Sequence, residues 1–287
     1  MRADRTTSSF LAGLNSIRRD SWSLVALPGL AFVVLGFGSA LAFTVIRSVT
    51  EPGPQNYLDL TSGLPARSLI TTFRASAIVS VVVLVLGYAY AYAMRVGPRW
   101  LRWYLIAFLA VQFATSSVAR SYAWVQLLQN NGVINKFLMN IGLIDAPLKL
   151  MRNDLGAIIG TTHVLMPHMI LILYAAMRQV DLGTVVAARS LGAGPIRAFF
   201  QIFVPATQTG ILIGTGLIFI LGLSFYATPA LLGSTSRQMV SALIMTQAEY
   251  GNFGRSSALS IALVSAALLS LFLISVISRR MQRRDEP

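Results

Sequence analysis

The chain has 287 residues, of which 55% are hydrophobic and only 11% are charged. A soluble domain carries about 25% charged residues, so this composition is typical of a protein embedded in a lipid bilayer. The absence of cysteine excludes disulfides, thiolate catalysis and cysteine metal sites. The net charge of +13 would suggest nucleic-acid binding in a soluble protein. The sequence shows no basic, aromatic-interleaved soluble face, however, so no nucleic-acid partner is expected.

Six segments of the chain are apolar over the length of about 20 residues that a helix needs to cross a bilayer. They predict an all-α, polytopic membrane helical bundle with spans at about 23–47, 70–94, 102–128, 155–177, 207–232 and 256–278. The polarity does not alternate over stretches of about 10 residues, as it would in the strands of a membrane barrel. We expect a cytoplasmic N-terminal segment, a transmembrane domain and a cytoplasmic tail at residues 1–22, 23–278 and 279–287.

The basic residues lie mostly in segments that face one side of the membrane. With the N-terminus inside, the inner segments hold Arg2, Arg5, Arg18, Arg19, Arg95, Arg99, Arg102, Arg178, Arg189, Arg197, Arg279, Arg280, Arg283 and Arg284. Cytoplasmic segments carry an excess of Arg and Lys, so both termini are predicted to be cytoplasmic. The first apolar run is longer than the core of a signal peptide, about 7–15 residues, and is predicted to be a retained span.

Two connections between spans have a pattern of their own. The apolar spacing of Val133 to Ile141 predicts a short helix along the outer surface. Between the fourth and fifth spans, Val186 to Pro205 reads VAARSLGAGPIRAFFQIFVP, in which helix-forming residues are broken by glycines and a proline. This pattern predicts a short helix–turn–helix at the membrane surface, where a component outside the membrane would hold it.

Several polar or aromatic side chains interrupt the spans, and such groups tend to face a bundle interior or water. The candidate translocation path therefore comprises Tyr122, Trp124, His163, His168, Ser224, Tyr226 and Thr228. The alternative for each of them is a hydrogen bond between neighbouring helices. Pro229 removes a backbone donor, which predicts a loosened helix beside Tyr226. No carboxylate lies inside a predicted span.

No residue of the sequence is predicted to be catalytic. The chain lacks a G-x-x-x-x-G-K-[ST] phosphate loop, so it should not hydrolyse ATP by itself. The only histidines, His163 and His168, point about 140° apart on a helix, and no metal site is expected. A membrane-embedded enzyme would need a nucleophile–base pair or a metal cluster within the membrane, and the sequence shows neither. A self-sufficient channel or secondary transporter would leave the Val186 to Pro205 loop without a purpose, so transport driven by a partner fits better.

This loop resembles the cytoplasmic signature of binding-protein-dependent ABC importer permeases. That signature reads Glu-Ala-Ala, three residues, Gly, nine residues, Ile-x-Leu-Pro, and the chain matches its spacing with Ala187-Ala188, Gly192 and Ile202-x-Val204-Pro205. The wider resemblance, to the spermidine/putrescine branch, covers nearly the whole chain. It is carried by Arg120-Ser-Tyr-Ala-Trp124, Asn131-Gly-Val-Ile-Asn135, Gly142-Leu-Ile-Asp-Ala-Pro147 and Ala227-Thr-Pro-Ala-Leu-Leu-Gly233.

The resemblance implies a type I ABC importer permease fold in the bacterial inner membrane, with a coupling loop at about 178–205. The residues that would contact a cytoplasmic ATPase subunit are Val186, Ala187, Ala188, Arg189, Gly192, Ala193, Gly194, Arg197 and Pro205. The signature's Glu is Val186 here, which removes one polar contact that Arg189 and Arg197 would replace. ATP and Mg²⁺ would be bound by the ATPase, with no cofactor in this chain.

The other implied partners are a second permease subunit of different sequence, a soluble substrate-binding protein and the lipid bilayer. The chain would form half of a translocation pathway for a polyamine or a related small amine-bearing solute. An opine or an aminophosphonate is the alternative substrate. A cationic substrate would be expected to meet carboxylates or aromatic faces, and the partner permease would have to supply the carboxylates.

Overall fold

The computed structural model describes residues 21–234 and 238–282, with side chains for 27–234 and 238–276. These residues form helices and no strand, as the composition predicts. The long helices are α2 (Ser21–Thr50), α4 (Gly63–Val96), α5 (Arg99–Ala114), α8 (Asp154–Gln179), α12 (Gln208–Ser224) and α15 (Phe253–Gln282). Four described helices are long and apolar enough to cross a membrane, or up to six if two bent helix pairs each count as one span.

Short helices join these long ones. They are α3 (Gln55–Leu58), η1 (Asp59–Thr61), α6 (Ser117–Leu128), α7 (Val133–Asn140), α9 (Leu182–Ser190), α10 (Pro195–Ala198), the π-helical turn η2 (Phe199–Phe203), α11 (Val204–Ala206), α13 (Ala227–Leu232) and α14 (Val240–Glu249). The short helix predicted over Val133 to Ile141 is confirmed as α7. Helix α14 was not predicted from the sequence.

The third predicted span, 102–128, is wrong as a single helix. The chain bends by 100° between α5 and the segment that begins with α6. Thr115 and Ser116 stand at the break, and the Thr115 hydroxyl donates to the Val111 carbonyl at 2.9 Å. Hydroxyl side chains that bond to the backbone weaken a helix at such positions. Only α5 runs along the bundle, while α6 lies across its direction.

The fifth predicted span, 207–232, is also wrong in extent, because α12 ends at Ser224. Continuing that helix would press the Pro229 ring against the carbonyl of Phe225, and Pro229 has no N–H to donate. Phe225 instead adopts an extended conformation, with ψ 123°. A new helix, α13, then starts and places Pro229 in its first turn, so the loosening predicted at Pro229 is confirmed.

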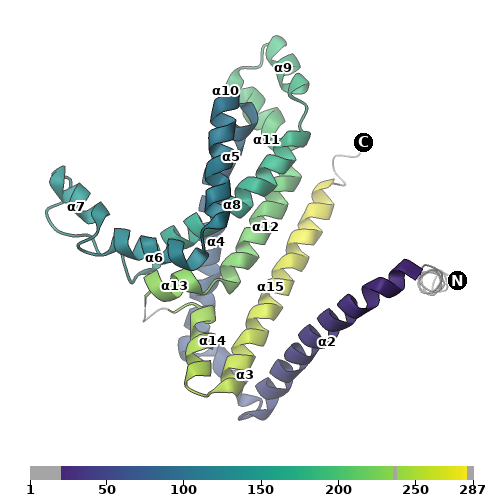
Figure 1. The fold of residues 1–287 in the computed structure, drawn as a ribbon, viewed down its shortest axis with the longest axis vertical. Coiled ribbons are helices and arrows are strands. Elements are labelled where there is room, and N and C mark those ends of the chain that lie inside the picture. Colours follow the sequence, from purple (N-terminus) through teal and green to yellow (C-terminus); the bar gives the residue numbers. More distant parts are fainter. Residues whose placement is uncertain (1–20, 235–237, 283–287) are drawn as a thin grey trace.

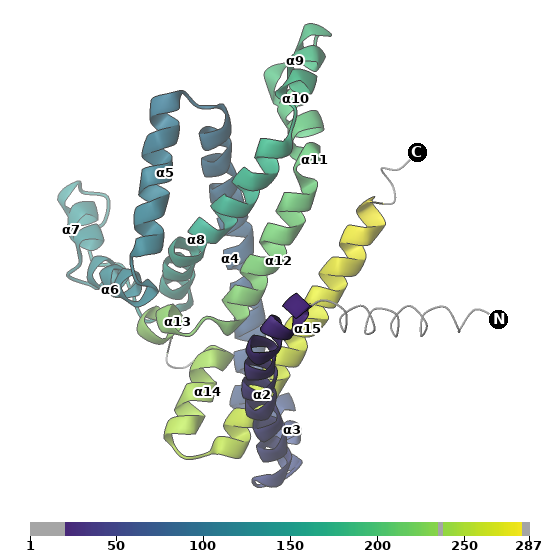
Figure 2. The same cartoon turned by 45° about the vertical axis from the view of Figure 1, so that its right-hand side comes forward.

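The core lies where α4, α8 and α12 pack against one another (Figures 1 and 2). Its fully buried side chains come from all three helices and from η2, and include Val83, Met169, Leu173, Met177, Phe203 and Ile218. A smaller cluster joins α12, α14 and α15 through Leu223, Val240, Leu243, Leu259 and Leu263. These two clusters make one continuous helical bundle.

The two ends of the bundle are clearly different (Figure 2). The α9 end carries α9, α10 and the α4–α5 turn, and the C-terminal end of α15 points the same way. The α14 end carries α3, α14 and the α14–α15 turn. The predicted terminal segments, 1–22 and 279–287, lie largely outside the described residues, and their boundaries stay predictions.

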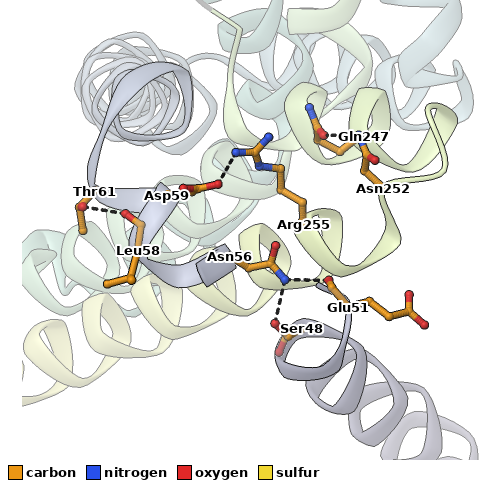
Figure 3. A network of polar contacts seen from close by, with 9 residues as sticks. All are labelled: Ser48, Glu51, Asn56, Leu58, Asp59, Thr61, Gln247, Asn252 and Arg255. Carbon is orange, nitrogen blue, oxygen red and sulfur yellow. Dashed lines mark hydrogen bonds and ion pairs between the residues drawn. The ribbon is translucent and has the colours of Figure 1, made fainter. Parts of the chain in front are cut away.

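At the α14 end, polar contacts join the α3–η1 segment to α2 on one side and to α15 on the other (Figure 3). The Asn56 amide donates to the Ser48 carbonyl at 3.1 Å and to the Glu51 carbonyl at 2.8 Å. Arg255 forms an ion pair with Asp59. Away from this end the two helices diverge, and α2 leaves the bundle with a fully exposed apolar stretch (Figure 1).

Candidate functional site

The predicted coupling loop, 178–205, is a helix–turn–helix that projects beyond the bundle at the α9 end (Figures 1 and 2). The Asp181 carboxylate accepts the Gly183 N–H at 2.8 Å and caps the start of α9. At its other end, the Ala193 N–H donates to the Ala188 carbonyl and the Gly192 N–H to the Arg189 carbonyl, both at 3.0 Å. This is a Schellman motif, which ends the helix sharply.

Glycine is required at the centre of that turn. Gly192 has φ +93°, a conformation that L side chains rarely adopt, although no atom lies within 4 Å of the position a Cβ would take. Gly194 then caps α10 and Pro195 occupies its first turn, where no N–H is needed. The turn therefore has a definite shape that the local sequence dictates.

The tip of this segment exposes apolar side chains outside the bundle. Val186 is 61% exposed and Leu191 90% exposed, and Ile196 and Phe200 are exposed as well. Two exposed arginines, Arg189 and Arg197, flank them, and the Arg197 Nε donates to the Gln201 side chain at 2.8 Å. An exposed apolar patch rimmed by charge is typical of a surface that binds another protein.

A cavity of about 260 Å³ lies between α4, α8, α13 and the start of α14. The Tyr226 ring, 42% exposed, forms part of its wall. Two charged side chains line it, Arg74 from α4 and Asp154 from the first turn of α8. Four neutral polar residues also line it, namely Thr71, Ser234, Gln238 and Thr246, and most of the remaining lining is apolar.

Asp154 corrects the expectation that no carboxylate lies in a span. Helix α8 begins at Asp154, one residue earlier than predicted, because Asn153 caps it by accepting the Gly156 N–H at 2.8 Å. A carboxylate is favoured in the first turn of a helix by the helix dipole. The Asn-Asp pair before an apolar run was the signal that could have found this residue, but its place in a cavity wall depends on three other helices.

A second group of polar side chains joins α5, α6 and α8. The His163 Nε2 lies 3.0 Å from the Gln112 Nε2, and the His163 ring lies 5.7 Å from the Trp124 ring. The Arg120 Nη1 lies 3.4 Å from both the Gln112 Oε1 and the Val164 carbonyl. Trp124 and His163 were predicted from the sequence, whereas Gln112, a polar side chain in the α5 half of the third predicted span, was not.

The other predicted path residues are scattered. The His168 ring packs on Phe113 at 5.3 Å, and Tyr122 is exposed on α6. The Ser224 hydroxyl donates to carbonyls of its own helix. Thr228 is completely buried, with its hydroxyl 2.6 Å from that of Ser121. Of the seven candidates, therefore, only Tyr226 lines the 260 Å³ cavity.

Small residues allow α13 to pack between α6 and α8. A Cβ on Gly160 of α8 would lie 2.5 Å from the Thr228 methyl and 2.6 Å from Leu232. Glycine at this position lets the backbones approach closely, as at many interfaces between membrane helices. The α6 part of the third predicted span and the α13 part of the fifth thus meet through Ser121 and Thr228, and α13 packs on Gly160.

Comparison with known proteins shows the family to which the chain belongs. A family model described as the binding-protein-dependent transport system inner membrane component matches residues 15–284. The chain belongs to this family. It is the permease subunit of an ABC importer, and it contains multiple apolar helices suited to a multi-pass inner-membrane component.

Curated relatives match this permease over most of its length. The spermidine/putrescine transport system permease protein PotB of Haemophilus influenzae is 29% identical over 234 residues, covering 81% of this chain and 82% of that protein. PotB of Escherichia coli is 29% identical over 220 residues, covering 76% and 80%. The molybdenum transport system permease protein ModB of Escherichia coli is 31% identical over 133 residues, covering 45% and 58%.

Solved structures share the fold of this permease. A chain of the bacterial alginate ABC transporter, in complex with an alginate pentasaccharide-bound periplasmic protein, superposes with a TM-score of 0.79 at 18% identity. The match covers 93% of this chain and 97% of that one. The MetNI methionine ABC transporter gives a TM-score of 0.55 at 16% identity, covering 76% and 95%. The predicted all-α, type I importer permease fold is confirmed.

Proposed function

We propose that this permease forms half of a translocation pathway for a polyamine such as spermidine or putrescine. The observation that carries the proposal is the coverage of the match to the PotB proteins, 76–81% of this chain at 29% identity. The match to ModB is confined to 45% of the chain. The alginate transporter has the same fold, but at 18% identity its cargo says nothing about this one.

The cavity beside Tyr226 has groups that suit an amine. A carboxylate, Asp154, and an aromatic ring, Tyr226, line the same hollow. An ammonium ion is attracted by both, and a ring face contributes roughly 0.5–2 kcal/mol depending on desolvation. This chain would thus supply one carboxylate itself, in addition to any from a partner permease.

A second candidate cargo is supported by Arg74, which lines the same cavity as Asp154. A guanidinium binds carboxylate or phosphonate oxygens with paired hydrogen bonds. A zwitterionic solute such as an opine or an aminophosphonate would use Arg74 and Asp154 together. The polyamine remains the first proposal because a sequence match over most of the chain supports it.

The proposed partners follow from surfaces that this chain leaves uncovered. The apolar tip of the coupling loop, with Val186 and Leu191, would seat on a cytoplasmic ATPase subunit that binds ATP and Mg²⁺. A second permease subunit of different sequence would complete the pathway. A substrate-binding protein would dock at the α14 end, where Leu58 and Tyr250 are exposed beside the Asp59–Arg255 ion pair. We expect no catalysis and no cofactor in this chain.

The proposed orientation places the α9 end in the bacterial cytoplasm. Exposed Arg99, Arg189 and Arg197 lie at this end, and positive charge is enriched on the cytoplasmic side of membrane proteins. Both termini would then be cytoplasmic and the α14 end periplasmic. The remaining exposed apolar surface of α2 would contact lipid or the second permease.

Uptake by the purified complex tests the proposed cargo. The chain would be tagged, isolated from its native membranes with its bound partners, and reconstituted in liposomes with the binding protein. ATP-dependent uptake of labelled spermidine or putrescine is expected, unaffected by excess opine or aminophosphonate. Absence of uptake for both polyamines, with ATP-dependent uptake of a labelled opine or aminophosphonate, would reject the polyamine. Recovery of the chain without an ATPase would reject the proposed coupling as well.

A further inference from the structure

We propose that α4 is the lever that the coupling loop moves, and that Tyr88, Tyr92 and Arg95 are the positioning residues that clamp the loop to it. The inference rests on the proposed seating of the loop on an ATPase. It concerns how a push at the loop tip would reach the transmembrane helices. Both ends of the loop are attached to the same helix, within one short stretch.

The entry to the loop is held by Arg95, in the last turn of α4. Its Nε donates to the Met177 carbonyl at 3.0 Å and its Nη2 to the Val180 carbonyl at 3.2 Å. These carbonyls belong to the C-terminal end of α8, where a cation is favoured by the helix dipole. Arg95 therefore fixes the point at which the chain leaves α8 and enters the loop.

The exit from the loop is held by aromatic rings. The Tyr92 ring meets Phe199 at 5.0 Å and Phe203 at 5.2 Å, both edge to face, and the Tyr88 ring meets Phe199 at 5.9 Å. Such ring pairs contribute beyond their buried area because the edge of one ring attracts the face of the other. The π-helical turn from Phe199 to Phe203 is thereby packed against α4.

A hydrogen bond adds to this attachment. The Tyr88 hydroxyl lies 2.9 Å from the Thr207 hydroxyl, at the start of α12. The Thr207 hydroxyl donates its own hydrogen to the Val204 carbonyl at 2.9 Å, so the Tyr88 hydroxyl is the donor between the two. The bond joins α4 to the point at which the chain re-enters the bundle.

The spacing of the three α4 residues makes the clamp rigid. Positions 88, 92 and 95 lie on one face of the helix, within about 11 Å along its axis. A displacement of α9 and α10 cannot be absorbed by a hinge at either end of the loop, because both ends move with α4. The other half of α4 lines the cavity through Thr71 and Arg74. Arg74 lies about 27 Å along the helix from Tyr92, so one rigid element joins the loop to the cavity.

Two substitutions test the clamp, with a matched control on the same helix. Tyr92→Leu removes the ring contacts and Arg95→Met removes both carbonyl contacts. The control, Tyr90→Leu, deletes a ring whose hydroxyl instead donates to the Leu105 carbonyl of α5 at 2.7 Å. Import per ATP hydrolysed should fall about two- to thirtyfold in the two clamp variants, the range that coupling mutations span. The control and Tyr92→Phe should retain the native ratio in complexes assembled to the same extent.

A ratio in both clamp variants equal to that of the control would overturn the inference. For variants that fail to insert, a covalent tie gives a second test. The chain has no native cysteine, so Tyr88→Cys combined with Thr207→Cys offers one reactive pair. Bridging this pair with a short bifunctional maleimide should raise import above that of the unbridged pair, because the covalent tie replaces the lost Tyr88–Thr207 contact. Loss of import on bridging would show that the loop slides past α4, and the clamp would be rejected.

The variant Gly192→Asp separates failure of the clamp from failure of the proposed function. It distorts the exposed turn of the loop and touches no residue of the clamp. If Gly192→Asp retains native import, the seating of the loop on an ATPase is wrong. If it abolishes import while Tyr92→Leu and Arg95→Met behave like Tyr90→Leu, the seating stands and α4 is not the lever.

Discussion

Tyr226 and Thr228 are only two positions apart in the chain, yet one is accessible and the other is buried. Tyr226 is 42% exposed and lines the cavity, whereas Thr228 is completely buried between α6 and α8. The sequence offers the same two explanations for both residues, a path-lining group or a hydrogen bond between helices. In the isolated subunit Thr228 makes that hydrogen bond, and Tyr226 keeps the accessible position that a substrate contact needs.

Replacing Tyr226 distinguishes a contact through its ring from one through its hydroxyl. Tyr226→Ala should lower the rate of polyamine import about two- to thirtyfold, which corresponds to a cation–π contribution of roughly 0.5–2 kcal/mol. Tyr226→Phe should lower it much less, because the ring remains. The measurement is uptake at equal amounts of assembled complex. Equal losses with poor assembly in both variants would instead indicate a packing role.

Replacing Thr228 should affect stability more than transport. Thr228→Val keeps the shape beside Gly160 but removes the hydroxyl that lies 2.6 Å from Ser121. Hydrogen bonds between membrane helices contribute about 0.6 kcal/mol on average, so a loss of about that size in unfolding free energy is expected. Unfolding in detergent measures it. Ser224→Ala, whose hydroxyl bonds only within its own helix, is the control. Native stability with impaired uptake would assign Thr228 to the path.

The shape of the predicted coupling loop is determined by nearby residues of the chain, although the loop is expected to act on distant helices. Its N-cap, its Schellman turn and the proline that starts α10 all lie within residues 181–195. The core contributes almost nothing to this turn, which stands in open space. A change at the turn should therefore alter energy coupling without unfolding the bundle.

Gly192→Asp should preserve insertion and abolish ATP-driven import. The φ of +93° is strained for any L residue, and the added charge would lie on an apolar tip. Gly142→Asp is the matched control, because Gly142 also has positive φ with open space around it, at the far end of α7. Import should be lost in the first variant and kept in the second. Normal import by Gly192→Asp would withdraw the coupling role.

Val186→Glu should be tolerated by the protein. Val186 is 61% exposed, so a carboxylate there can stay in water, and it restores the residue that the family signature carries. Import at the native rate or faster is expected in reconstituted complexes. A strong loss of import at unchanged assembly would mean that the ATPase groove in this system requires an apolar side chain at position 186.

At the scale of the whole molecule, the isolated subunit is incomplete. Helix α2 contacts the bundle mainly at the α14 end, through α15, and exposes a predominantly apolar stretch along the rest of its length (Figure 1). Helix α5 exposes large apolar side chains as well, including Trp100, Trp103 and Phe108. Lipid and a second permease subunit are the partners that can cover such surfaces.

Reporter fusions test the orientation of the whole subunit. A reporter placed after Arg284 should give a cytoplasmic signal, because the arginine bias predicts that both termini are inside. A reporter inserted after Gly251, in the α14–α15 turn, should give a periplasmic signal. The same signal at both positions would overturn the number of spans, and exchanged signals would overturn the orientation.

The sequence by itself determined the class of the protein, the number of apolar segments and the family. Hydrophobicity is a property of consecutive residues, so the first, second, fourth and last spans could be placed from the sequence. Each predicted end lies within a few residues of the observed helix end, except that α4 begins at Gly63 rather than at residue 70. The turn at Gly192 could also be predicted from the sequence, because Gly192, Gly194 and Pro195 determine the local backbone conformation by themselves. These features need no contact between distant parts of the chain.

Only the tertiary structure decided where the spans break and which polar groups meet. The apolar residues on both sides of Thr115 and Ser116 hid the 100° bend, because α6 is stabilised by packing against α8 and α13 rather than by its own sequence. Arg74, Asp154 and Tyr226 lie on three helices far apart in the chain, and no local pattern can show that they share a cavity. The clamp on α4 has the same origin, because its contacts join residues separated by more than 80 positions in the chain.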